Sequence, residues 1–367
     1  MRIKLKVISG LALCAATALP LAGCWDKVEL ESRGIVNAIS VDKDTSSGDV
    51  KVAVALPNLA EIAAKNGAKQ GPVQEGRGKT LLAAIRDADG KTNQKLFLGQ
   101  MKAVIFGSDA LKDESIMRSA IDTLRRSEEV NRKVLLFAAD DQAEDILEAK
   151  LEGNPLIGTY FTTFYKNSSV SRGSYIKQDL QGAAEALESN GACLIPKIGA
   201  GEGFICPEGA DLIKNYQYVD DLTMDQTDGV LLLQNKCVGM SDTAEIDGAF
   251  ASLRIKSCVK HASFALDGQG KITYNLRLDI KGDVQEQDDE NRQALKEAFQ
   301  KNIAARITEV AGIFSRANAD GFGLGQEMYK FANDLYENRA SAAGFMEELT
   351  VVPSVSVEIG SNGMISR

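Results

Sequence analysis

The residue with the clearest chemistry in this chain is Cys24, which directly follows Leu21, Ala22 and Gly23. Upstream lie three cationic side chains within the first six residues and then a largely apolar run that ends at position 23. A cationic start, an apolar run and small residues before a cut site are typical of a signal peptide. A cysteine directly after the cut is what a lipoprotein signal peptidase needs, once its thiol carries diacylglycerol. We therefore predict that residues 1–23 are a lipoprotein signal peptide with lipobox Leu21, Ala22 and Gly23, and that Cys24 is the lipid attachment site.

The alternatives for this segment are an ordinary secretory cut site and a membrane-spanning helix. A spanning helix needs about 20 apolar residues, whereas this run is short and contains Ser9 and Pro20. One acyl chain anchors marginally and two anchor stably. We expect the mature chain to reach the membrane through acylated Cys24, on its outer face, without a transmembrane helix.

Four further cysteines remain in the mature chain, Cys193, Cys206, Cys237 and Cys258. An exported protein can form disulfides, but four thiols allow three pairings and the sequence does not choose among them. Their spacings contain no Cys-x-x-Cys motif, which argues against a metal site. We favour the simpler interpretation that they are small buried apolar residues.

Catalytic and cofactor motifs are missing from the sequence. His261 is the only histidine, so any Ser-His-Asp or Cys-His arrangement would depend on it. The stretch from Asp42 opens like a calcium loop, but Ser47 stands where glycine is needed and Ala53 where glutamate is needed. The glycine-rich segments at 199–203 and 321–325 lack the phosphate-binding spacing. We predict no catalytic residues, no metal site and no cofactor, and therefore no enzyme.

The charge balance bears on partners. The chain carries 42 basic and 51 acidic residues, which gives a net charge of −9. Removal of the leader takes away three basic residues and makes the mature chain still more acidic. An acidic body of this kind is a poor partner for nucleic acid, so none is expected.

The patterning in the first half predicts strands that alternate with helices. Residues 35–41 and 50–56 form a hairpin around a polar turn, and the glycine-rich stretch 65–79 is expected to be a mobile loop. Helices are expected from Thr80 to Gly90, over 115–126 and from Asp141 to about Leu151, the last with a capping box from Glu144. Buried strands are expected at 96–98, 102–106 and 134–138.

The second half predicts mainly strands and one long helix. The strands are expected at 230–233, 249–256, 260–266, 271–279 and 351–359. Leu295, Phe299, Ile303, Ile307, Val310 and Phe314 make one apolar helical stripe, typical of core packing. We predict an α+β fold with several mixed or antiparallel sheets packed with helices, in an N-terminal domain (24–205), a linker (206–228) and a C-terminal domain (229–367) that is possibly subdivided.

Several short motifs occur in the order found in one known family. Cys24-Trp25-Asp26 leads into a segment from Gly34 to Asp42, and Gln94–Lys102, Leu194–Lys197, Gly229–Gly239 and Asp320–Gly323 follow. Together they resemble the C-subunit lipoproteins of bacterial spore germinant receptors. That resemblance implies a non-enzymatic subunit in the spore's inner membrane, with germinant receptor A and B subunits as partners and nutrient-triggered germination as its role.

Two other classes of function remain open at this point. One is a solute-binding lipoprotein of a membrane importer, which would need two lobes around a ligand cleft. The other is an anchored hydrolase, against which the single histidine, His261, is the main argument.

Overall fold

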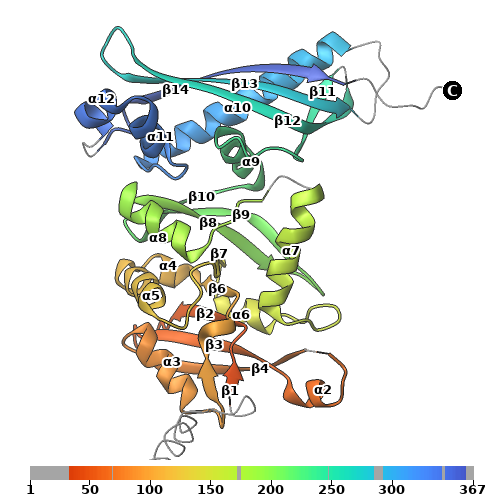
Figure 1. The fold of residues 1–367 in the computed structure, drawn as a ribbon, viewed down its shortest axis with the longest axis vertical. Helices are drawn as coiled ribbons and strands as arrows, with labels where there is room; N and C mark the ends of the chain where they lie inside the picture. The colour runs from red at the N-terminus through yellow and green to blue at the C-terminus, as the bar shows by residue number, and fades with distance from the viewer. Residues whose placement is uncertain are drawn as a thin grey trace, which may run out of the picture.

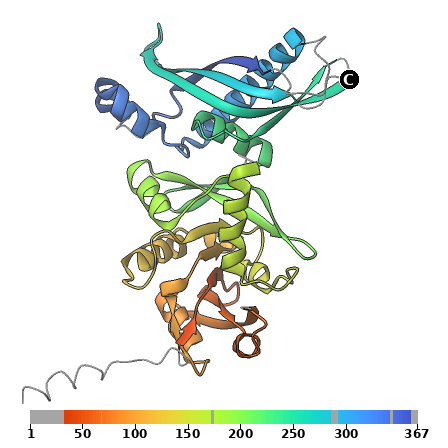
Figure 2. The same ribbon diagram turned by 45° about the vertical axis from the view of Figure 1, so that its right-hand side comes forward.

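The computed structural model describes residues 33–67, 69–171, 175–246, 248–284, 292–340 and 344–360. The molecule is an elongated stack of layers, in which the chain runs from β1 (Arg33–Ile35) at one end to the C-terminal sheet at the other (Figures 1 and 2). β1 pairs in parallel with β5 (Lys95–Phe97). The short 3-10 helix Leu98–Gln100 follows β5.

A large mixed sheet occupies the first half of the stack. Its eight strands lie in the order β10-β9-β8-β7-β6-β2-β3-β4. The four central strands β2, β6, β7 and β8 run parallel, and the outer strands are antiparallel to their neighbours. The bounds are β2 Ala38–Lys43, β3 Val50–Pro57, β4 Gln70–Gly78, β6 Ala103–Phe106, β7 Leu135–Ala138, β8 Ala192–Ala200, β9 Ile205–Lys214 and β10 Gln217–Leu222.

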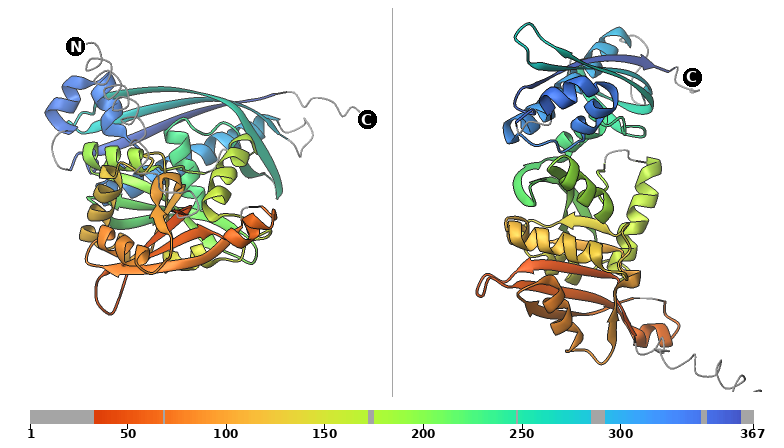
Figure 3. Two further views of the ribbon diagram at one scale, coloured as in Figure 1. Left: turned by 60° about the horizontal axis from the view of Figure 1, so that its bottom comes forward. Right: turned by 60° about the vertical axis from the view of Figure 1, so that its left-hand side comes forward.

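Helices cover both faces of this sheet. On one face lie α3 (Leu81–Asp89), α4 (Ser108–Leu111), α5 (Glu114–Arg126) and α8 (Leu180–Ser189), which share a core with one set of strand residues. On the other face lie α6 (Ala143–Glu148) and α7 (Ile157–Ser171), and Figure 3 shows α7 standing apart from α5 and α8. Because both faces are buried, strands β6 and β7 at the centre are continuous apolar runs rather than alternating ones. A short helix, α2 (Leu59–Ala63), leaves the sheet after β3.

The C-terminal layer is a four-stranded sheet packed on a long helix. Its order is β11-β12-β13-β14, with β14 parallel to β13. The bounds are β11 Ser241–Ile246, β12 Ala249–Leu266, β13 Ile272–Val284, β14 Leu349–Ile359, α9 Met224–Leu233, α10 Arg292–Ala317, α11 Leu324–Phe331 and α12 Asn333–Leu335. The expected stripe of α10 is buried along its whole length. The same core includes Leu194 of β8 and Leu212 of β9, so the two halves of the stack share apolar packing.

Two expectations about loops are wrong. Residues 70–78 form β4 rather than part of a mobile loop. A Cβ at Gly76 would lie 2.1 Å from the Ala84 carbonyl oxygen, so glycine here lets α3 pack directly on the strand. The expected linker 206–228 is instead made of β9, β10 and the start of α9. Its single glycine, Gly209, serves the strand pairing, since it has φ 136° and a Cβ there would meet the Leu222 carbonyl oxygen at 1.9 Å.

Two helix assignments also need correction. Residues 230–233 belong to helix α9 and not to a strand, because Thr223 and Gln226 form a capping box at its start and the apolar run is buried on all sides. The predicted capping box of Asp141 and Glu144 does not form, since the first turn of α6 is capped by Asp42 of β2. Helices α7 and α8 had not been expected. The α+β class, with mixed sheets packed against helices, is confirmed, whereas the division into domains stays a prediction.

Candidate functional site

The predicted lipid site lies outside the described residues. Cys24 and its lipobox, Leu21, Ala22 and Gly23, precede Arg33, where the described chain begins. That first strand, β1, lies at the end of the stack farthest from the C-terminal sheet (Figure 1). Within the described ranges no helix is both long enough and apolar enough to cross a membrane.

His261 lies on the C-terminal sheet and is exposed. Its Nε2 atom is 3.5 Å from a carboxylate oxygen of Asp279 on the neighbouring strand. Among the described residues no hydroxyl or thiol is hydrogen-bonded to it, and no group of three or more metal-ligating side chains occurs. His261 and Asp279 therefore form a cross-strand contact of the kind that is common on the surface of a sheet.

Two of the ordered motifs meet in space. The segment from Gly34 to Asp42 provides β1 and β2, and the segment from Gln94 to Lys102 provides β5 and leads into β6. Gly34 pairs with Leu96, and the Lys102 backbone N–H donates to the Asn37 carbonyl oxygen at 2.8 Å. Residues of three other motifs, Leu194, Leu231 and Gly321, line one hollow elsewhere in the stack. The Cys24-Trp25-Asp26 motif lies outside the described residues.

Two acidic residues of these motifs, Asp42 and Asp320, cap helices. The Asp42 carboxylate accepts from the backbone N–H groups of Ala143 (2.7 Å) and Glu144 (3.2 Å). The Asp320 carboxylate accepts from three consecutive N–H groups, those of residues 323–325, at 2.7–2.8 Å. Both sites satisfy helix N-terminal donors that would otherwise be unpaired, so the two aspartates have structural roles.

A charged cluster surrounds Lys197, the last residue of the Leu194–Lys197 motif. Its ammonium lies 3.2 Å from Asp140 and 3.4 Å from Asp221, and its side chain is only 12% exposed. Asp211 is buried beside this cluster. Burial raises the pKa of Asp211 to about 7, and the charges of Asp140 and Asp221 act in the same direction while Lys197 opposes them.

The Asp211 carboxyl predicts a pH dependence of stability. The folded chain holds this proton up to about pH 7, whereas an unfolded aspartate loses it near pH 4. The folded state therefore binds more protons between these values, and the stabilisation is lost as the pH rises. The unfolding free energy of the parent chain should therefore fall from pH 5 to pH 8. In Asp211→Asn we expect this fall to be smaller, by on the order of 3 kcal/mol.

Urea unfolding at both pH values measures this effect. Asp334→Asn, at an exposed carboxylate, is the matched control and should keep the slope of the parent chain. Burial also raises the pKa of Asp42 and of Asp242 to about 6, so a residual slope is expected in the variant. An unchanged slope in Asp211→Asn would contradict the prediction.

The four cysteines differ in their surroundings. Cys193 and Cys237 are buried, and all four are free thiols. The neighbouring thiol of Cys258, together with burial, raises the pKa of Cys237. Cys193 and Cys206 lie on adjacent strands but far out of register, since Cys193 pairs with Ile213 and Cys206 with Gly199. Of the possible pairings, only Cys237 with Cys258 has its thiols adjacent.

Comparisons with known proteins define the class. Residues 26–200 match the family described as "Spore germination protein N-terminal domain", and residues 208–363 match "Spore germination B3/ GerAC like, C-terminal". A chain with both parts, in this order and with this α+β fold, belongs to the C-subunit family of spore germinant receptors.

Particular relatives agree with this assignment. The chain is 25% identical to "Spore germination protein A3" of Bacillus subtilis (strain 168) over 281 residues, which cover 76% of this chain and 74% of the relative. It is 20% identical to "Putative spore germination protein YfkR" of the same organism, over 97% and 96% of the two chains. The crystal structure of the GerBC protein shares the fold, with a TM-score of 0.60 at 17% identity, over 88% of this chain and 96% of that one. The predicted family is thereby confirmed.

Proposed function

We propose that this chain is a lipid-anchored, non-enzymatic subunit of a germinant receptor, required for spores to germinate in response to nutrients. Acylated Cys24 would hold it on the outer face of the spore's inner membrane, in complex with the receptor's A and B subunits. The observation that carries the proposal is the match of both halves of the chain, in order, to spore germination families. The lipobox before Cys24 supports the anchor.

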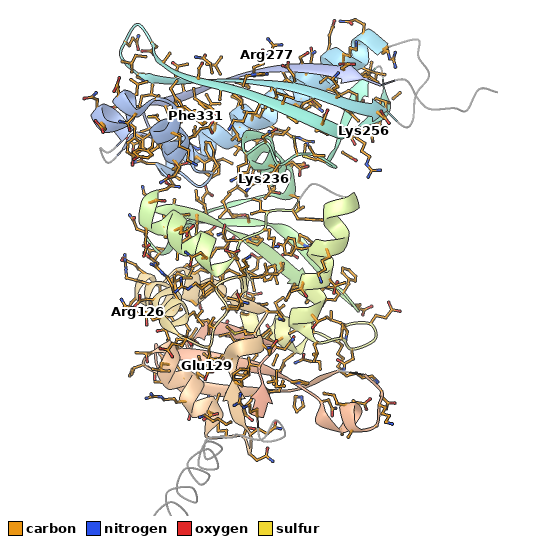
Figure 4. The ribbon with its side chains drawn as sticks, viewed as in Figure 1. Arg126, Glu129, Lys236, Lys256, Arg277 and Phe331 are labelled. Carbon is orange, nitrogen blue, oxygen red and sulfur yellow. The ribbon has the colours of Figure 1, made fainter. Side chains whose placement is uncertain are left out.

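The shape of the molecule supports an interaction role. β1 lies at one end of the stack, so an anchor nine residues before its start at Arg33 would place the C-terminal sheet away from the attachment point (Figure 1). Near that distal sheet α11 exposes two aromatic side chains, Tyr329 (55% exposed) and Phe331 (77%), the latter labelled in Figure 4. Exposed aromatic residues are enriched where proteins meet partners, and we assign α11 to subunit contact. The sequence alone does not reveal this surface, because the exposure of Tyr329 and Phe331 depends on how α11 packs in the folded chain.

Deletion of the gene tests the proposal. In a spore former that keeps only the receptor to which this chain belongs, we expect deletion to abolish the nutrient response, measured as loss of refractility. Germination by a trigger that bypasses nutrient receptors should be normal, and reintroduction of the intact gene should restore the nutrient response. A normal nutrient response in the deletion strain would count decisively against a receptor role.

A further inference from the structure

We propose that a hollow between α7 and α9 binds a small anion that carries two or more carboxylate or phosphate groups. The hollow has a volume of about 640 Å³, within the range usual for small-molecule sites. Four lysines line it, Lys133, Lys166, Lys177 and Lys236. Figure 4 labels Lys236 below α9, where the C-terminal layer meets the eight-stranded sheet.

The charge of this hollow is opposite to that of the chain. Acidic residues outnumber basic ones in the sequence, yet no aspartate or glutamate occurs among the described residues that line it. Two other hollows of the described chain are balanced. One combines Lys43, Lys112 and Arg118 with three acidic residues, and another pairs Lys214 with Asp320. The accumulation of positive charge is therefore a local feature and does not follow from composition.

Three of the four lysine ammoniums are available to a ligand. Within the described part of the chain, Lys133, Lys177 and Lys236 have no carboxylate within ion-pair distance, and all three are exposed to solvent. Two acidic residues that flank lining residues in the sequence, Asp179 beside Gln178 and Asp320 beside Gly321, are already engaged. Asp179 accepts from the backbone of α8, and Asp320 accepts from that of α11. Neither carboxylate forms an ion pair with Lys133, Lys177 or Lys236 in the described part of the chain.

The walls of the hollow favour a compact ligand. Leu135, Leu194 and Leu231 are buried side chains that contribute to its lining. Apolar walls of low dielectric focus the field of charges placed around them. Each lysine ammonium acts as a point charge with three hydrogen-bond donors. Several ammoniums around one hollow therefore bind an anion with several charged oxygens more tightly than they bind a monovalent anion.

Such a ligand would bridge two layers of the molecule. Lys133 precedes β7 and Lys177 precedes α8, both in the part built on the eight-stranded sheet, whereas Lys236 follows α9. An anion held between these lysines contacts both parts and opposes their separation. Binding should therefore raise the unfolding temperature.

Calorimetric titration of the full chain with pyrophosphate and with citrate tests the proposal. In 0.15 M NaCl we expect one site per chain with a Kd below about 1 mM, weakening as salt is added. Acetate, a monovalent carboxylate, should bind at least ten-fold more weakly. We expect the double variant Lys177→Gln, Lys236→Gln to lose at least ten-fold in affinity for the polyvalent anions.

A matched control and a folding readout complete the design. Lys271→Gln removes an exposed lysine at the β12–β13 turn and should bind as the parent chain does. Without anion, the double variant should unfold at or above the parent temperature, because mutual repulsion among the lysines is reduced. Equal affinity in the double variant, equal loss in Lys271→Gln, or binding to phosphatidylglycerol vesicles without any binding of pyrophosphate or citrate would overturn the proposal.

Discussion

A mature chain that lacks Cys24 is expected to leave the membrane fraction almost completely. The physical reason is that each methylene buried in the bilayer contributes about 0.8 kcal/mol, so that the two chains of a diacylglyceryl group anchor stably. Among the described residues no helix could replace them by crossing the membrane. We expect at least a ten-fold fall in the membrane-bound share after a high-salt wash, measured by fractionation and immunoblotting.

The variant has to avoid a retained leader, because an uncut apolar segment would itself hold the chain in the membrane. The leader is therefore exchanged for an ordinary secretory one, so that the cut product begins at Trp25. The matched control carries the same exchange but keeps Leu21, Ala22, Gly23 and Cys24 before that tryptophan. Mass spectrometry should find the acyl mass on Cys24 of the control alone. Both products are made in a host without the A and B subunits, so that partner binding cannot retain them. A Trp25 product that stays with washed membranes there as firmly as the control would rule out lipid as the anchor.

The part of the fold that could be predicted rests on periodicity and local caps. The apolar stripe predicts both the position of α10 and the face that it buries, because six apolar side chains at helical spacing lie on one side of a helix and pack into one core. Thr80 and Gly90 marked the ends of α3 correctly, since both act on the backbone of the helix itself. The turn between β2 and β3 was also found, and there the Asp44 carboxylate accepts from the backbone N–H groups of Ser46 and Ser47.

What could not be predicted depends on partners that are distant in sequence. The cap of α6 comes from Asp42, which lies 101 residues before Ala143, and no local pattern could identify it. The run 230–233 is buried on all sides in α9, and a short apolar run of this kind has no period that separates helix from strand. The lysines of the α7–α9 hollow come from separate segments, so their common position appears only in the folded chain.

Strand β4 is the clearest example of this limit, and it leads to the second large prediction. Its sequence resembles a loop because glycine and polar residues dominate it, yet it pairs with β3 from Pro57 to Val50. The glycines are needed because α3 lies directly on the strand. A Cβ at Gly76 would lie 2.1 Å from the Ala84 carbonyl oxygen and 2.5 Å from the Ala88 nitrogen. Both atoms belong to the helix backbone, which cannot move aside without breaking the packing of Ala84 and Ala88 in the core.

We therefore expect Gly76→Ala to lower the unfolding free energy by about 3 kcal/mol or more, at the upper end of what overpacking costs. Gly268→Ala is the matched control, since a Cβ there meets nothing within 4 Å and its backbone is not left-handed. That variant should be unchanged or slightly more stable, because alanine reduces the entropy of the unfolded chain. Urea midpoints of the two variants measure the difference. Equal midpoints would mean that α3 does not press on β4 and that residues 70–78 are free to behave as the loop that their composition suggests.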